Sequence, residues 1–289
     1  MTDQQEQNIS AAITAAAAKL QAAGVEDARR EASSLLAFVL DRESVFLIAH
    51  PEYELSGDET QRFAAAIERR ANREPFHYIV GKKEFYGLEF IVAPGVLIPR
   101  PETELLVEDA IKLLSGCSNP HFLEIGVGSG CISVSILHNV PNATAIGVDI
   151  SETALSIAAA NANQHNVANR LILTSSNVYE SVDVHTRFDL IVSNPPYIPD
   201  SDLPTLQSEV REFEPHSALF GGNDGLNIVR RIVSDAPRFL KIGGHILIEI
   251  GFGQAASVKE LFDGSIWDEI GFIRDLQGIE RHVKAKFRG

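Results

Sequence analysis

From about residue 120 to its end, the chain alternates between short strand-like segments and segments of helical periodicity. Strand-like segments, apolar and rich in β-branched residues, occur at 122–125, 143–149, 171–174, 188–193 and 245–250. Strands that alternate with helices usually form a mostly parallel sheet with helices on both faces. We therefore predict an α/β domain here, whose ligands bind beyond the carboxyl ends of the strands.

The first 74 residues are of a different kind. Apolar residues recur at helical spacing in 9–23, 27–40 and 58–72, and 44–49 is typical of a short helix. No glycine-rich loop or histidine cluster occurs there, so we expect a small helical bundle that packs or recognises a partner. Aromatic and β-branched residues around Gly87 then predict a β-hairpin. The expected domains are 1–74 (helical), 75–95 (hairpin linker) and 96–289 (α/β).

Composition and charge exclude several functional classes. The 289 residues include 25 basic and 39 acidic side chains, a net charge of −14, which disfavours nucleic acid as a partner. Apolar runs are far shorter than the ~18 residues of a membrane span. The polar, acidic start is unlike a secretory signal, so we expect a cytoplasmic protein. Neither the two cysteines nor the nine histidines have metal-ligand spacing, and no metal is expected.

A glycine-rich turn follows the strand-like segment 122–125. Its sequence is Gly126-Val127-Gly128-Ser129-Gly130. Glycines at this position let the backbone turn sharply into a helix and approach a ligand closely. Cys131 stands where a dinucleotide-binding fingerprint has its third glycine, which argues against a nicotinamide cofactor. A purely structural glycine turn is the alternative.

Two polar residues end the next two strand-like segments. Asp149 lies where a carboxylate accepts hydrogen bonds from both ribose hydroxyls of a bound nucleoside. A helix N-cap is the alternative role, although Ser151 fits that role better. Asn177 is placed either to meet an adenine edge or to form a turn. The pattern predicts a nucleoside site at the carboxyl end of the sheet.

The sequence Asn194-Pro195-Pro196-Tyr197 follows the strand-like segment 188–193. Its prolines fix the backbone and lack N–H groups, so carbonyl oxygens remain as acceptors. A planar NH₂ group would find one acceptor in the Asn194 side chain and one in the Pro195 carbonyl, with Tyr197 stacked on it. The tetrapeptide therefore indicates methyl transfer to an amide or amino nitrogen; a tight proline loop is the alternative.

The glycine turn, Asp149 and this tetrapeptide together resemble the class I S-adenosylmethionine-dependent methyltransferases that methylate nitrogen. Two stretches narrow the resemblance: 84–104, which ends in Pro-Arg-Pro-Glu-Thr-Glu, and 214–226. They are similar to the HemK/PrmC family, the N5-glutamine methyltransferases of peptide chain release factors. This resemblance covers nearly the whole chain.

The resemblance implies a Rossmann-like, seven-stranded sheet joined to a helical domain that recognises the substrate. It implies S-adenosylmethionine as cofactor, S-adenosylhomocysteine as its product, and the glutamine of a Gly-Gly-Gln motif as acceptor. The implied cofactor-binding residues are Gly126, Val127, Gly128, Ser129, Gly130, Asp149, Asn177, Val178 and Asn194. The implied catalytic residues are Asn194, Pro195, Pro196 and Tyr197, which also bind substrate together with Arg100, Glu102 and Thr103.

Three other functions remain open at this stage. They are a ribosomal-protein glutamine methyltransferase, a nucleic-acid adenine-N6 methyltransferase and a cofactor-binding adaptor without activity. The charge of −14 argues against nucleic acid, and the intact tetrapeptide 194–197 argues against an adaptor. We expect class I release factors as partners of a monomer that binds neither nucleic acid nor membrane.

Overall fold

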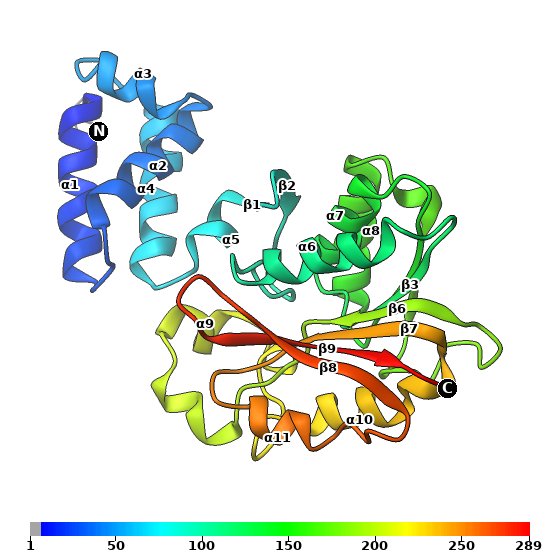
Figure 1. Cartoon of the computed structure of the whole chain (residues 1–289). Coiled ribbons are helices and arrows are strands. Elements are labelled where there is room, and N and C mark those ends of the chain that lie inside the picture. Colours follow the sequence, from blue (N-terminus) through cyan, green and yellow to red (C-terminus); the bar gives the residue numbers. More distant parts are fainter. Residues whose placement is uncertain (1–6) are drawn as a thin grey trace. The chain divides into compact units, whose positions relative to one another are not determined.

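The computed structural model describes residues 7–289, and the chain forms two compact units (Figure 1). One unit contains the chain up to Gly81 together with Gln207–Phe213, and the other contains Lys82–Leu206 and Glu214–Gly289. Among residues 7–289, no helix is both long and apolar enough to cross a lipid bilayer.

The first unit is all-helical, as predicted. Asn8 caps α1 through its side chain, and Ser56 with Glu59 forms a capping box at the start of α4. Leu20, Leu35 and Leu36 are fully buried in its core. Its helices are α1 (Ile9–Ala22), α2 (Ala28–Leu40), α3 (Ser44–Ala49), α4 (Gly57–Ala71), α5 (Phe76–Val80) and α9 (Ser208–Phe213).

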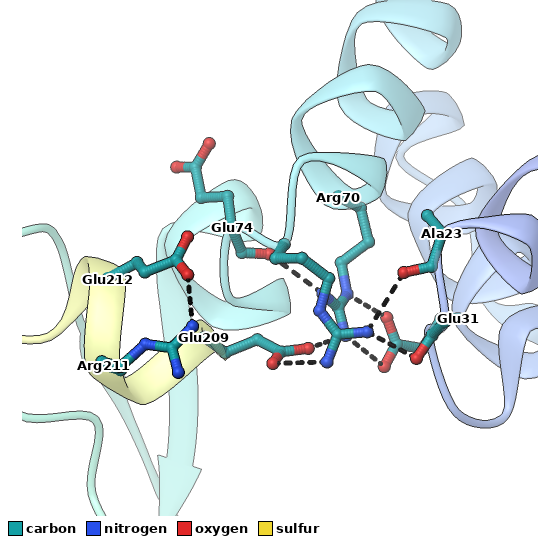
Figure 2. A network of polar contacts seen from close by, with 9 residues as sticks. Ala23, Glu31, Arg70, Glu74, Glu209, Arg211 and Glu212 are labelled. Atoms are coloured by element: carbon teal, nitrogen blue, oxygen red, sulfur yellow. Dashed lines mark hydrogen bonds and ion pairs between the residues drawn. The ribbon is translucent and has the colours of Figure 1, made fainter. Parts of the chain in front are cut away.

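A buried cation holds α9 within this unit. Arg70 of α4 is only 5% exposed, and its guanidinium donates to Glu31 of α2 and to Glu209 of α9, the latter at 3.1 Å. Arg73 donates to the second oxygen of Glu209 at 2.7 Å. Figure 2 shows Arg70 between the two carboxylates. Because a buried charge is costly without partners, these pairs tie α9 to α2 and α4.

The compact units end at other residues than the expected domains. Helix α5 lies in the expected linker, but its Ile79 is buried in the helical core. The expected hairpin forms from β1 (Lys82–Phe85) and β2 (Leu88–Ile91), paired antiparallel. Its Phe85 and Phe90 are buried in the core of the second unit. Helix α5 and the hairpin are thus buried in different hydrophobic cores, and the boundary between the units lies near Gly81.

The second unit is built on one seven-stranded sheet in the order β5-β4-β3-β6-β7-β9-β8. All neighbours are parallel except those of β9, which runs antiparallel to β7 and β8. The predicted seven-stranded, mostly parallel sheet is confirmed, as is the predicted contact between 122–125 and 188–193. The strands are β3 (His121–Ile125), β4 (Thr144–Asp149), β5 (Leu171–Ser175), β6 (Phe188–Ser193), β7 (Leu240–Glu249), β8 (Trp267–Arg274) and β9 (Glu280–Phe287).

Helices cover both faces of this sheet (Figure 1). Successive side chains of a strand alternate between faces, so Leu190 and Val192 pack in one core and Ile191 in the other. Helices α6 (Thr103–Leu114), α7 (Cys131–Asn139) and α8 (Glu152–Gln164) contribute to the first core, and α10 (Asn227–Asp235) and α11 (Ala255–Lys259) to the second. Short 3₁₀ helices span Ala168–Arg170, Asp200–Thr205, His216–Ala218 and Ala236–Arg238.

Candidate active site

A pocket lies at the carboxyl ends of β3, β4, β5 and β6, within the second unit. This is the edge at which open parallel sheets bind ligands. The predicted site residues that line the pocket are Arg100, Thr103, Gly126, Val127, Gly128, Ser129, Asp149, Asn177, Val178, Asn194 and Pro196.

The glycine turn forms one wall of this pocket through its backbone. Gly126 and Gly128 have φ values of 75° and 53°, which side chains rarely allow. Gly130 lies behind the wall, where a Cβ atom would come within 3.1 Å of the Ala158 Cβ. The glycines therefore serve two purposes, a close approach to the pocket and tight packing of the turn against α8.

Asp149 is anchored to this turn. Its Oδ2 accepts from the Gly128 amide at 2.9 Å, and its Oδ1 accepts from the Ser151 amide at 2.9 Å. Ser151 itself caps α8 by accepting from the Ala154 amide, as its sequence position predicted. Each carboxylate oxygen has a further lone pair, so Asp149 retains capacity for ligand hydroxyls.

Glu124 is a pocket residue that the sequence reasoning missed. It is 1% exposed, and its Oε2 accepts from the Ser133 amide at 2.9 Å and from the Ser133 hydroxyl. Its Oε1 has no hydrogen-bond partner within residues 7–289. Burial, with a smaller effect of the Asp149 charge, raises the pKa of Glu124 to about 8. A buried carboxyl oxygen without a partner is rare, which makes Glu124 a candidate for contact with a ligand.

Asn177 and Val178 lie on the wall beside β5. The Asn177 side chain is exposed, donates to Glu180 at 2.9 Å and accepts from Arg231 at 2.9 Å. Val178 is buried with a φ of 61°, a conformation that is strained for a β-branched residue. Such strain concentrates at ligand sites. The apolar side chain of Val178 is thereby held at the pocket wall.

The tetrapeptide 194–197 lies beside the glycine turn, as predicted. Ser193 and Ile125 are paired residues of adjacent strands, and the Ser193 hydroxyl donates to the Ile125 carbonyl at 2.7 Å. Gln254 donates to the Tyr197 carbonyl at 2.9 Å. A Cβ atom on Gly225 would lie 2.0 Å from the same carbonyl oxygen, so only glycine fits there. These contacts of Ser193, Gln254 and Gly225 thus fix the backbone conformation of the tetrapeptide.

A buried polar chain connects this tetrapeptide to α6 and β7. Asn194 donates through Nδ2 to the Thr103 hydroxyl at 3.1 Å, and Thr103 donates to Glu249 Oε2 at 2.8 Å. The Tyr197 hydroxyl donates to Glu249 Oε1 at 3.2 Å. Burial and the Glu249 charge raise the pKa of Tyr197, so its hydroxyl stays protonated. Thr103 and Glu249 are each 2% exposed.

The remaining predicted residues differ in their relation to the pocket. Arg100 lines it and donates to Glu214 Oε1 at 2.6 Å, while Oε2 of this buried carboxylate accepts from the Ile98 amide at 3.2 Å. Glu102 is exposed and does not line the pocket. Gly130, Pro195 and Tyr197 are not among its lining residues either.

Known proteins match this chain in both units. Residues 11–81 match the PrmC N-terminal domain, and residues 101–209 match the methyltransferase small domain. A release factor glutamine methyltransferase of Geobacter sulfurreducens is 43% identical over 266 residues, 91% of either chain. This chain belongs to the release factor glutamine methyltransferase family. Another family member, from Koribacter versatilis, is 39% identical over 95% of this chain and 97% of its own.

A solved structure agrees with the fold of this release factor glutamine methyltransferase family member. A methyltransferase from Pyrococcus furiosus superposes with a TM-score of 0.52 over 80% of this chain and 99% of its own, at 19% identity. The predicted family and the predicted enzyme class, an S-adenosylmethionine-dependent methyltransferase, are confirmed by the matches.

Proposed function

We propose that this protein transfers the methyl group of S-adenosylmethionine to the side-chain amide nitrogen (N5) of the glutamine in the Gly-Gly-Gln motif of class I peptide chain release factors. The observation that carries the proposal is that one pocket brings together Gly126, Gly128, Asp149 and Asn194. The reaction that we assign to this pocket is inferred from the family to which the chain belongs. Methylation of that glutamine would modulate translation termination.

The pocket residues fit the parts of S-adenosylmethionine. Asp149 would accept from the ribose hydroxyls, and the positive methionine ammonium would favour the ionised form of Glu124 and pair with it. Val178 offers apolar surface for the adenine, whereas the Asn177 amide is already bonded to Glu180 and Arg231. When bound, the cofactor supplies a methyl group on a positively charged sulfur and is released as S-adenosylhomocysteine.

The tetrapeptide would hold the acceptor amide. The Asn194 side-chain oxygen and the Pro195 carbonyl would each accept one N–H of the glutamine, and the Tyr197 ring would pack against its plane. A glutamine nitrogen is a weak nucleophile because its lone pair is shared with the carbonyl group. Two acceptors on its hydrogens favour a pyramidal nitrogen and stabilise the positive charge that grows there.

Arg100 would close the pocket beside the acceptor. Its guanidinium is half-buried and held by Glu214, so its position at the pocket wall is fixed. Glu102 was expected beside it, but its side chain is exposed outside the pocket. Glu102 would therefore contact the release factor outside the pocket.

We further propose that the enzyme acts in the cytoplasm as a monomer, without a metal, a membrane or a nucleic acid. Its methyl donor is already activated by the sulfur charge, so the transfer itself needs no Lewis acid. The net charge of −14 supports a protein substrate over a nucleic acid. The helical unit would dock the body of the release factor.

The test is mass spectrometry of purified release factor after incubation with enzyme and isotopically labelled S-adenosylmethionine. We expect one labelled methyl group on the glutamine of the Gly-Gly-Gln peptide, and labelling slower by about 10²–10³-fold with Asn194→Ala at the same enzyme concentration. Parallel reactions with ribosomal protein and with adenine-containing DNA cover the other substrates. Labelling of either of these, with an unlabelled release factor, contradicts the proposal.

A further inference from the structure

A chain of three hydrogen bonds ends at the side-chain amide of Asn194. It begins at the Tyr197 hydroxyl, passes through the Glu249 carboxylate and the Thr103 hydroxyl, and reaches Asn194 Nδ2. Glu249 is the last residue of β7, and Thr103 is the first residue of α6. Residues of α6 and β7, which lie outside the tetrapeptide, are thus connected by hydrogen bonds to the Asn194 side chain.

The chemistry of the groups fixes the direction of each bond. An ionised carboxylate can only accept, so both hydroxyls donate to Glu249. The single hydrogen of the Thr103 hydroxyl is therefore used at Glu249, 2.8 Å away. Towards Asn194, at 3.1 Å, Thr103 can only accept. The Asn194 atom that faces it must be the donor Nδ2.

The orientation of an asparagine amide is otherwise ambiguous. Its oxygen and nitrogen are alike in size, and only the surrounding hydrogen bonds distinguish them. Flipped by half a turn, Asn194 would present NH₂ to the NH₂ of the substrate glutamine, and two donors would face one another. The acceptor role of Asn194 thus requires something that prevents the flip.

We propose that Thr103 and Glu249 are positioning residues that hold the Asn194 amide with its Oδ1 towards the substrate. This proposal rests on the proposed function for the identity of the substrate, but the amide orientation is a property of the free enzyme. Thr103 thereby acts through Asn194, instead of contacting the substrate as the resemblance implied.

His282 completes the surroundings of Glu249. It pairs with Glu249 across β7 and β9, is fully buried, and its Nε2 lies 3.6 Å from Glu249 Oε2. Within residues 7–289 neither ring nitrogen has a hydrogen-bond partner. Two hydroxyl donors therefore hold the carboxylate, and the buried His282 ring lies close to it.

The first test observes the amide without any substrate. Protein labelled with ¹⁵N-asparagine gives side-chain NH₂ signals in NMR spectra, and Asn194→Asp identifies the Asn194 signal by its loss. We expect hydrogen exchange of this NH₂ to be roughly 10-fold faster in Thr103→Val, which has the same shape but no hydroxyl, and near wild type in Thr103→Ser. Equal exchange in wild type and Thr103→Val would overturn the proposal.

The second test is kinetic and uses a glutamine-containing release factor. Thr103→Val should lower kcat by about 10–100-fold with KM within about 3-fold, and Thr103→Ser should restore most of the rate. Glu249→Gln should be at least as impaired as Thr103→Val. Its amide can donate to Thr103, which then donates to Asn194 and favours the flipped amide. A Thr103→Val enzyme with wild-type kcat refutes the positioning role.

Thr144→Val is the matched control. Thr144 begins β4, at the amino end of the strand, and its hydroxyl also bonds a side chain, His121, at 2.9 Å. Loss of this hydroxyl should leave both kcat and the exchange rate of the Asn194 amide unchanged. Changes in Thr144→Val as large as those in Thr103→Val would count against the proposal. If the wild-type enzyme methylates no release factor, the proposed function fails, while the exchange experiment still decides the orientation of Asn194.

Discussion

The two sides of the pocket are built from different materials. The proposed cofactor side is shaped largely by backbone, since Gly126 and Gly128 have no side chains and two backbone amides fix the Asp149 carboxylate. The proposed acceptor side depends more on bonds between side chains, since Asn194 donates to Thr103 and Thr103 donates to Glu249. A backbone wall depends little on neighbouring side chains, whereas one lost hydroxyl can disturb the acceptor side.

The largest effect should come from the acceptor side. Asn194→Ala removes one of two acceptors and should lower kcat by about 10²–10³-fold, with little change in the affinity for S-adenosylhomocysteine. Asn194→Asp keeps an acceptor oxygen and should be less impaired. Rates are to be compared at saturating cofactor. Wild-type rates in both variants would make Asn194 a structural residue.

A change on the cofactor side should have a separate signature. Asp149→Ala removes a charged acceptor for the ribose and should weaken S-adenosylhomocysteine binding by about 10–100-fold in calorimetric titration. Binding of a glutamine peptide should change much less. Ser151→Ala, which removes only the cap of α8, is the control. The same weakening in both variants would mean that Asp149 matters only for the helix start.

The helical unit allows the comparison to be extended to substrate size. Deleting residues 1–74 should raise KM for whole release factor by about 10-fold or more, but not for a short glutamine peptide, because a catalytic pocket alone contacts little surface. The deletion also removes the partners of Glu209, so full-length Glu209→Gln is the control for a released α9. Equal changes of KM for both substrates would argue against docking.

The smallest expected effect concerns stability, and it appears in how Tm depends on pH. Folding raises the pKa of Glu124 from 4.5 to about 8, so the folded protein binds this proton more tightly than the unfolded chain. This contribution to stability is complete below pH 4.5 and is lost as the pH rises towards 8. Glu124→Gln cannot ionise. Its Tm should therefore fall by at least about 5 °C less than that of wild type between pH 5 and pH 9, measured by calorimetry without cofactor.

Local motifs made the sheet predictable, and they also indicated the residues of the proposed cofactor side. A glycine turn at a strand end, a carboxylate at the next strand end and the two prolines after Asn194 each depend on residues adjacent in sequence. Parallel strands then bring their carboxyl ends to one edge, which places Asp149 and Asn194 around the same pocket. Glu124 had a signal too, because an acidic residue in an otherwise apolar strand before Gly126 needs a reason.

The acceptor side was less predictable because its contacts are distant in sequence. Thr103 and Glu249 are separated by 146 positions, and nothing near either residue predicts their hydrogen bond. The same holds for Arg100 and Glu214. Glu102 was expected to bind substrate but is exposed. The sequence of the motif 99–104 does not show which of its side chains point into the pocket.

The return of α9 to the helical unit has a consequence for how the protein acquires its structure. Arg73 precedes Glu209 by 136 positions, so the ribosome finishes α1 to α5 long before this partner exists. At about 5–20 residues per second, Arg70 and Arg73 wait for several seconds or more without it. The last contact of the first unit to form must therefore await much of the second, and closing so long a loop slows it further.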